Sequence, residues 1–267
     1  MDARLIRAIA VTLLLALPPG SALAQGFDHS HAAWTALLEK HVVLLDGGRA
    51  SQVRYGGFQQ DRAALKGYLQ SLSGVAQQEF DGWSKAQRMA FLINAYNAFT
   101  VEKILTRYPD IRSIWDFGKI FGNPFRDRFF TLLGEKASLD HIEHETLRKP
   151  GAYDEPRVHY AVNCASIGCP MLREKAYVAE RLEAQLEGQA VRFLSDRSRN
   201  RYDAPSGALE VSRIFDWFKE DWKSREQYFA RYAALLADDP EHRKLIASGK
   251  ARIRFLEYDW ALNDAKR

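Results

Sequence analysis

Both cysteines of this 267-residue chain lie in one short segment, Arg157-Val-His-Tyr-Ala-Val-Asn-Cys-Ala-Ser-Ile-Gly-Cys-Pro170. Alternating β-branched and aromatic residues predict a strand over 157–163, and Gly168 and Pro170 predict a turn after it. A side chain where a strand ends in a tight loop is both held in place and accessible. Cys164 lies at that point, so it is the candidate nucleophile, provided that a nearby base or positive dipole lowers the pKa of its thiol.

The spacing of the two cysteines leaves other roles open. Cys164 and Cys169 are close enough in sequence to close a small loop as a disulfide, which an oxidising compartment would favour. They could also be inert buried thiols, or act together in thiol redox chemistry. Two cysteines separated by four residues do not form a recognised zinc-binding or thioredoxin-type motif. A nucleophile must be free and acidic whereas a disulfide is unreactive, so the first two hypotheses predict opposite thiol states.

A second cluster is Ser138-Leu-Asp-His-Ile-Glu-His-Glu-Thr-Leu-Arg148, which the sequence predicts as a short capped helix. Glu143 and His144 are candidate catalytic residues, because a carboxylate beside a histidine can orient the base that a thiol needs. His141 and His144 lie three residues apart and, with His159, could bind a metal. Charged residues on a short amphipathic helix usually face solvent, and the spacing fixes no third ligand, so we predict no metal site.

Two histidines compete for the role of base. In a strand, His159 and Cys164 would be an odd number of positions apart and would point to opposite faces, so they meet only where the strand ends or bulges. That argument favours His144 as the base, with Glu143 orienting its imidazole, and we keep His159 as a candidate.

Polar residues inside an apolar helical run supply candidate substrate contacts. Asn94 and Asn97 lie three residues apart, so at least one is predicted to be buried and to need hydrogen-bond partners. One interpretation is that they tie the helix to a neighbouring loop. The other is that an amide faces the cleft and donates to substrate or to a developing oxyanion. Asn163 and Ser166, beside Cys164, complete the candidates for substrate or oxyanion contacts.

The elements that must position these residues mix helices and strands without regular βαβ alternation. Helices are predicted at about 30–46, 61–73 behind a cap at Asp61, 85–108 behind a cap at Ser84, 139–149, 177–195, 216–236 and 239–248. Strands are predicted at 128–133, 157–163, 207–214 and 252–258, with a hairpin turn at 133–135. We therefore predict an α+β fold: one compact domain over 25–267 with a small, mostly antiparallel sheet and surrounding helices, distantly similar to papain or transglutaminase folds. The aromatic stretches 213–222 and 256–263 are predicted to be core.

Composition and charge exclude several classes of function. The chain is 46% hydrophobic and 27% charged, as an ordinary folded domain is, and its net charge of +4 is too small to indicate nucleic-acid binding. It has no Gly-x-Gly-x-x-Gly or phosphate-loop lysine motif and no Gly-x-Ser-x-Gly elbow. Nucleotide binding and a serine nucleophile therefore lack sequence support, and we predict no cofactor.

The first 24 residues have the pattern of a secretory signal peptide. Arg4 and Arg7 form a positively charged region, Leu5 to Leu17 an apolar region, and Ala22-Leu-Ala24 a small-residue cleavage site. The apolar run falls well short of the ~20 residues that span a bilayer. We expect cleavage after Ala24, no transmembrane segment in the mature chain, and a periplasmic or secreted protein.

Five motifs occur in an order that resembles the domain of unknown function 547 family. They are Phe91-Leu-Ile-Asn-Ala-Tyr-Asn97, Ser138-Leu-Asp-His-Ile-Glu-His144, His159-Tyr-Ala-Val-Asn-Cys-Ala-Ser-Ile-Gly-Cys-Pro170, Ile214-Phe-Asp-Trp-Phe218 and Tyr258-Asp-Trp-Ala-Leu-Asn263. The resemblance covers roughly 84–263. It implies an exported bacterial protein and places the candidate site residues on the family's motif positions, but it implies no activity.

The leading hypothesis is a thiol-dependent hydrolase or acyltransferase in which Cys164 attacks an acyl group and His159 or His144 takes the thiol proton. The alternative is a non-catalytic binding module of the cell envelope, in which a disulfide between Cys164 and Cys169 is structural. The expected ligand is a peptide, an amide or an envelope component.

Overall fold

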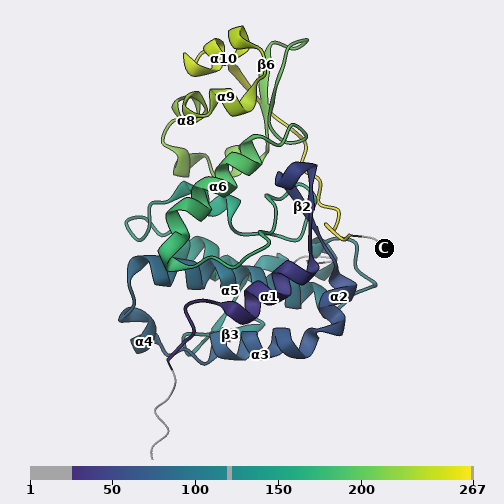
Figure 1. Ribbon diagram of the computed structural model, residues 1–267, viewed down its shortest axis with the longest axis vertical. Coiled ribbons are helices and arrows are strands. Elements are labelled where there is room, and N and C mark those ends of the chain that lie inside the picture. Colours follow the sequence, from purple (N-terminus) through teal and green to yellow (C-terminus); the bar gives the residue numbers. More distant parts are fainter. Residues whose placement is uncertain (1–25, 119–121, 266–267) are drawn as a thin grey trace, which may run out of the picture.

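The computed structural model describes residues 26–118 and 122–265. Its helices and short strands confirm the predicted α+β class (Figure 1). The predicted signal peptide, residues 1–24, lies outside the described residues. In the part of the chain that is described, no helix combines the length and the apolar character needed to cross a membrane.

The longest helix, α5 (Lys85–Leu105), is the centre of the larger hydrophobic core. Its start confirms the cap predicted at Ser84: the Ser84 side chain accepts a hydrogen bond from the Gln87 backbone, and the Gln87 side chain accepts one from the Ser84 backbone. Every side chain from Met89 to Val101 is buried. A helix that is buried on all sides needs other elements around it.

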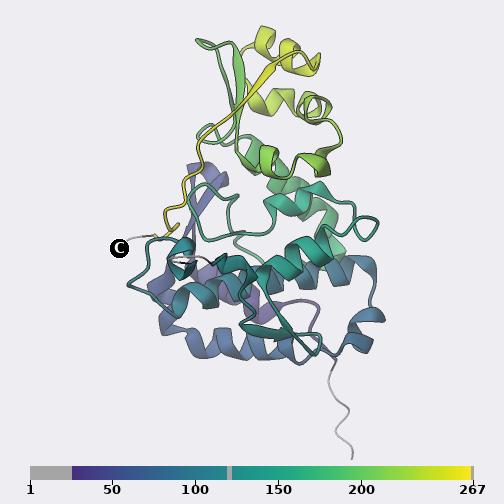
Figure 2. The ribbon, with the colours of Figure 1, turned by 180° about the vertical axis from the view of Figure 1, so that it is seen from behind.

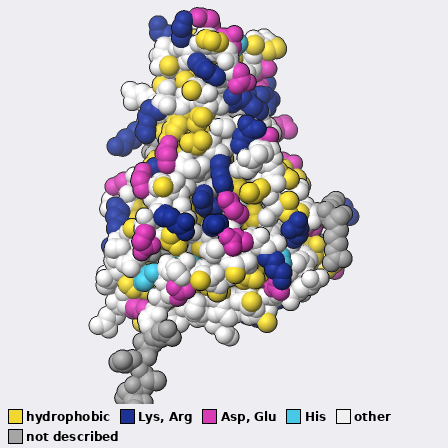
Figure 3. Space-filling model, viewed as in Figure 1, with side chains coloured by type: hydrophobic (Ala, Val, Ile, Leu, Met, Phe, Trp, Pro, Cys, Tyr) yellow, Lys and Arg dark blue, Asp and Glu magenta, His cyan; other side chains and the backbone are white. Residues whose placement is uncertain are grey.

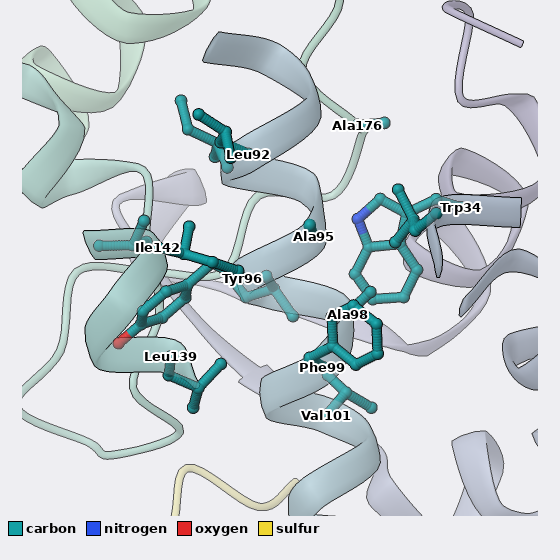
Figure 4. Packing of buried hydrophobic residues seen from close by; sticks show 14 of the residues in the cluster. Trp34, Leu92, Ala95, Tyr96, Ala98, Phe99, Val101, Leu139, Ile142 and Ala176 are labelled. Carbon is teal, nitrogen blue, oxygen red and sulfur yellow. The ribbon is translucent and has the colours of Figure 1, made fainter. Parts of the chain in front are cut away.

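Two groups of elements supply that cover. Trp34 packs in the same buried cluster as Phe99, while on another side of α5 the ring of Tyr96 reaches toward Leu139 and Ile142 (Figure 4). The helices around α5 are α1 (Ala32–His41), α2 (Tyr55–Gln60), α3 (Arg62–Ser73) and α4 (Gln77–Asp81). The central helix therefore joins this N-terminal layer to the segment that carries the candidate catalytic residues.

A second, smaller core lies at the other end of the molecule (Figures 1 and 2). Strand β6 (Ala208–Val211) pairs antiparallel with β5 (Arg201–Asp203) and parallel with β7 (Arg252–Phe255). The helices of this part are α6 (Leu182–Leu194), α7 (Ile214–Trp217), α8 (Arg225–Arg231), α9 (Ala233–Leu236) and α10 (Pro240–Ala247). The single helix predicted over 216–236 is wrong, because the chain breaks there into α7, the 3₁₀ turn η7 (Lys219–Trp222), α8 and α9.

Two further hairpins complete the strands. Strands β1 (Val42–Leu45) and β2 (Ala50–Val53) pair antiparallel, so the helix predicted to about 46 ends at His41 and continues as a strand. Strands β3 (Phe130–Leu132) and β4 (Glu135–Ala137) flank the predicted turn, where Leu133 and Gly134 both have positive φ. The described strands are mostly antiparallel, as predicted, but they are divided among three small sheets.

The strand predicted over 157–163 is wrong. The chain forms the 3₁₀ helix η5 (Pro156–Tyr160), which begins with a proline at its first turn and with the Glu155 side chain accepting from the Arg157 backbone. All side chains from Val158 to Asn163 are buried, so the alternation of a half-buried strand is absent. The remaining short helices are the 3₁₀ turns η1 (Asp46–Gly48), η2 (Ile114–Gly118), η3 (Pro124–Arg126) and η6 (Ala179–Arg181) and the π-helix η4 (His141–Leu147).

Candidate active site

One cavity brings together residues from separated parts of the chain. It has a volume of about 470 Å³ and is bordered by α5, η2, η3, η4, η5 with the loop after it, α7 and the C-terminal segment after β7. Its polar lining residues are Asn123, Asp140, Glu143, His144, His159 and Cys164. All four predicted catalytic residues, Cys164, His144, His159 and Glu143, therefore line the same cavity.

Two asparagines hold the loop that carries Cys164. The Asn97 side chain donates to the Ala161 carbonyl at 2.9 Å and accepts from the Asn163 backbone at 2.8 Å. The Asn163 side chain donates to the Pro170 carbonyl at 2.8 Å and accepts from the Ala165 backbone at 3.0 Å. These contacts match the interpretation in which an amide ties the long helix to a loop, and neither asparagine lines the cavity.

The C-terminal segment fixes the other side of this loop. The Gly168 backbone donates to the Asp259 carbonyl at 2.8 Å, and the Ile167 backbone donates to the Ala261 carbonyl at 2.8 Å. A Cβ atom at Gly168 would lie 3.0 Å from both the backbone N and O of Asp259, so a larger residue would crowd this approach. The contact places Tyr258 next to Cys164.

The thiol of Cys164 lies within a set of hydrogen-bond donors. Its Sγ is 3.1 Å from Ser166 Oγ, 3.1 Å from the Tyr258 hydroxyl and 2.7 Å from Cys169 Sγ. Burial raises the pKa of the Cys164 thiol, but the hydrogen bonds from Cys169, Ser166 and Tyr258 outweigh it, so the pKa is below its ordinary value. Between Cys164 and Ser166 the chain turns through Ala165, whose φ of 63° is in the left-handed region that alanine rarely adopts.

Cys169 has the opposite character. It is buried, and burial together with its hydrogen bond to Cys164 raises the pKa of its thiol well above the ordinary value. Its Sγ accepts a hydrogen bond from the Cys164 backbone at 2.9 Å. Both cysteines are free thiols in this structure, not the disulfide of the alternative hypothesis. The two thiols are therefore inequivalent, and Cys164 is the more acidic.

His159 is held by a carboxylate that the sequence interpretation missed. Its Nε2 lies 2.7 Å from Asp221 Oδ2, and its ring stacks on Phe218 with 4.1 Å between ring centroids. Burial raises the pKa of Asp221, but the hydrogen bonds from His159 and Arg148 lower it by a larger amount, so the pKa is about 2. The other ring nitrogen, Nδ1, is buried and has no hydrogen-bond partner among the described residues. Asp221 therefore orients the imidazole through Nε2, while Nδ1 is left without a hydrogen-bond partner among the described residues.

Glu143 and His144 come from the π-helix η4, a rare helix type that is frequent at functional sites. Glu143 is buried, accepts a hydrogen bond from the Tyr96 hydroxyl, and has its Oε1 3.9 Å from His159 Nδ1, which is too far for a hydrogen bond. His144 Nδ1 accepts from Arg148 at 2.5 Å. Neither histidine is among the hydrogen-bond partners of Cys164 in the described part of the chain.

The other predicted site residues take different places. Asn94 is buried away from the cavity, where its side chain pairs with both the N–H and the carbonyl of Tyr177. Ser166, by contrast, is next to the Cys164 thiol. His141 pairs with Glu145 at 2.9 Å and does not line the cavity. Over residues 26–118 and 122–265, no group of three or more His, Cys, Asp or Glu side chains is arranged to hold a metal ion.

The prediction that both aromatic stretches are core is partly wrong. Phe215 and Trp222 are buried, as predicted, but Trp217 is 42% exposed and lines the cavity together with Tyr258 and Trp260. Aspartate and tyrosine at 221 and 258 carry no sequence signal of their own, because they meet His159 and Cys164 only in the folded chain.

Comparison with known proteins finds a family match over part of the chain. Residues 80–194, from the end of α4 to the end of α6, match the model of the family described as "Protein of unknown function, DUF547". This segment includes the cysteine loop, η4 and η5, whereas the motifs at 214–218 and 258–263 lie beyond it. No curated protein and no solved structure matches the chain. The family match is therefore confined to residues 80–194, which carry the sequence similarity to DUF547.

Proposed function

We propose that this protein is a thiol-dependent acyl-transfer enzyme, a hydrolase or acyltransferase, with Cys164 as its nucleophile. One observation carries the proposal: the more acidic of the two thiols lines the same cavity as His159. Asp221 holds Nε2 of this histidine, and its buried Nδ1 has no hydrogen-bond partner among the described residues. An acidic thiol and an oriented histidine are the two parts that thiol catalysis requires.

In the proposed reaction, the Cys164 thiol gives its proton to His159 Nδ1 through a water molecule in the cavity, because the two side chains are not hydrogen-bonded to each other. The thiolate attacks the carbonyl carbon of an ester or amide. A C–S bond forms, the bond to the leaving group breaks, and His159 returns the proton to that leaving group. Water or an amine then attacks the thioester, with His159 taking the proton, and the free thiol is restored. The products are an acid, or a new amide, and the released alcohol or amine.

Negative charge moves from sulfur to the carbonyl oxygen during the attack. Ser166 Oγ and the Tyr258 hydroxyl already lie 3.1 Å from Cys164 Sγ, so we assign them as donors to the oxyanion. Burial raises the pKa of Tyr258 well above its ordinary value, which keeps its proton available for donation. The three candidate asparagines already use their amides to hold backbone groups.

The orienting group of the base in this proposal is Asp221 and not Glu143. Asp221 is at hydrogen-bond distance from His159, whereas the Glu143 carboxylate is 3.9 Å away. His159 is preferred over His144 as the base, because Arg148 occupies Nδ1 of His144. The signal-peptide pattern of residues 1–24 supports a periplasmic or secreted location for this activity.

The test is the capture of the acyl-enzyme. The exported protein is mixed with p-nitrophenyl butyrate, quenched in acid within milliseconds to seconds, and analysed by intact mass and peptide mapping. We expect one butyryl group on Cys164, removable by hydroxylamine, in the wild-type chain and in Cys169→Ser. Absence of acylation at Cys164, together with equal ester hydrolysis by Cys164→Ser, would refute the proposal.

A further inference from the structure

An aromatic wall extends from Cys164 to the mouth of the cavity. Tyr258, whose hydroxyl contacts the thiol, lies 4.8 Å from Trp217 and 4.6 Å from Trp260 between ring centroids. Trp217 and Trp260 stack at 5.6 Å, and Trp115 meets Trp260 edge to face at 5.3 Å. Trp115 and Trp217 are 39% and 42% exposed. Three indoles from distant parts of the chain therefore share one partly exposed wall, where a ligand could cover them.

The charge of the lining is unlike that of the rest of the molecule. On the face in Figure 3, Lys and Arg side chains lie among Asp and Glu side chains, and the whole chain has a basic surplus. Among the described lining residues, however, Asp140 and Glu143 are carboxylates and none is Lys or Arg. The nearest arginine to Asp140 is Arg126, at 3.6 Å, and its side chain is 74% exposed. Arg148 does not line the cavity; it pairs with Asp221 and Glu220 and donates to His144.

The polar side of the cavity has, among the described residues, one acceptor without a donor, His159 Nδ1, beside the carboxylate of Glu143. His159 is 3% exposed, lines the cavity, and its Nδ1 has no partner among the described residues. Glu143 Oε1 lies 3.9 Å from that nitrogen. An N–H group placed beside both atoms would satisfy the nitrogen and the carboxylate together, and a positive charge on that group would be favoured by the carboxylate and by the indole faces.

We propose that the cavity binds a primary alkylammonium group, so that a primary amine is either the product released from an amide substrate or the acceptor of the acyl group. The identification of the amine as a substrate rests on the proposed function. When an amide is cleaved, His159 protonates the departing amine as the C–N bond breaks. When an amine accepts the acyl group, His159 first takes a proton from the bound ammonium. The neutral amine then attacks the thioester and forms the C–N bond as the C–S bond breaks. The thiolate takes the proton that the amine loses on attack, which restores the thiol, and His159 releases the proton of the ammonium to solvent.

Binding is measured on Cys164→Ala, which cannot turn over substrate. Butylammonium, butan-1-ol and butyrate, four-carbon probes that differ in charge, are titrated against tryptophan fluorescence at constant ionic strength. We expect butylammonium to bind at least about tenfold more tightly than butan-1-ol, and butyrate to bind more weakly still. Equal affinities for butylammonium and butan-1-ol would overturn the inference.

Matched variants locate the site. Glu143→Gln removes the charge and keeps an acceptor for Tyr96, and we expect it to weaken butylammonium binding at least about fivefold without weakening butan-1-ol binding. Glu241→Gln removes the same charge from α10, where that side chain is exposed, and should have no effect. A Glu143→Gln effect no larger than that of Glu241→Gln would overturn the inference. Butylammonium binding in a chain that never acylates at Cys164 would refute the proposed function alone.

Discussion

Cys164→Ser is expected to lower kcat/KM for ester and amide substrates by at least about 10³-fold while the fold is retained. A serine hydroxyl has a far higher pKa than the thiol, so no comparable nucleophile forms at neutral pH. The substitution is close to isosteric and keeps a group that hydrogen-bonds with Ser166 and Tyr258, so thermal unfolding should stay within a few degrees of wild type. Steady-state kinetics and a melting curve check both parts.

Cys169→Ser is the matched control for that variant. Cys169 contacts Cys164 but has a thiol pKa well above the ordinary value, so it is not the nucleophile. We expect a milder loss, because one donor to the Cys164 sulfur is altered. Equal losses in the two variants, or full activity in Cys164→Ser, would contradict the assignment of Cys164.

His159→Gln is expected to reduce kcat by about 10²- to 10³-fold, because it removes the group that transfers the proton. Asp221→Asn should reduce kcat by a smaller factor with little change in KM, since the imidazole loses the carboxylate that orients it and balances its charge. Because the folded-state pKa of Asp221 is about 2, below its unfolded value, its contribution persists above about pH 4 and is lost only as the pH falls toward 2. Activity changes at higher pH therefore arise from other groups.

Glu220→Gln is the control for Asp221→Asn. Glu220 also pairs with Arg148, at 3.1 Å, but it is not among the hydrogen-bond partners of His159. Its loss should leave kcat unchanged. If Glu220→Gln and Asp221→Asn were equally impaired, the role of Asp221 would be to hold Arg148 and not to orient His159.

Local signals in the sequence predicted those parts of the fold that local interactions determine. The cap at Ser84, the helix after it and the turn at Leu133-Gly134 all depend on residues a few positions apart. The failed strand at 157–163 has the β-branched and aromatic residues of a strand, but Pro156 and the Glu155 cap favour a helical start, and burial on every side replaces alternation. Tertiary packing overrides propensity in such a short segment.

The candidate site was predictable in its residue types but not in its pairings. Cys164, His144, His159 and Glu143 line one cavity, as the leading hypothesis requires. The argument that favoured His144 as the base assumed a strand, and it fails because the segment is a 3₁₀ helix followed by a loop. Asp221 and Tyr258 are 62 and 94 residues away from their partners in sequence. Nothing local to those positions distinguishes a residue of the site from a residue of the core.

The most direct measurement for the central claim is the pH dependence of alkylation at the two cysteines. The native protein is treated with iodoacetamide from pH 5 to 10, with and without reductant, and each site is quantified by peptide mass mapping. We predict labelling of Cys164 without reductant, with a midpoint below about 8.5, the pKa of an unperturbed cysteine, while Cys169 stays unlabelled until the chain is unfolded. Labelling of both cysteines only after reduction, or a Cys164 midpoint at or above that of a free cysteine, would contradict the account.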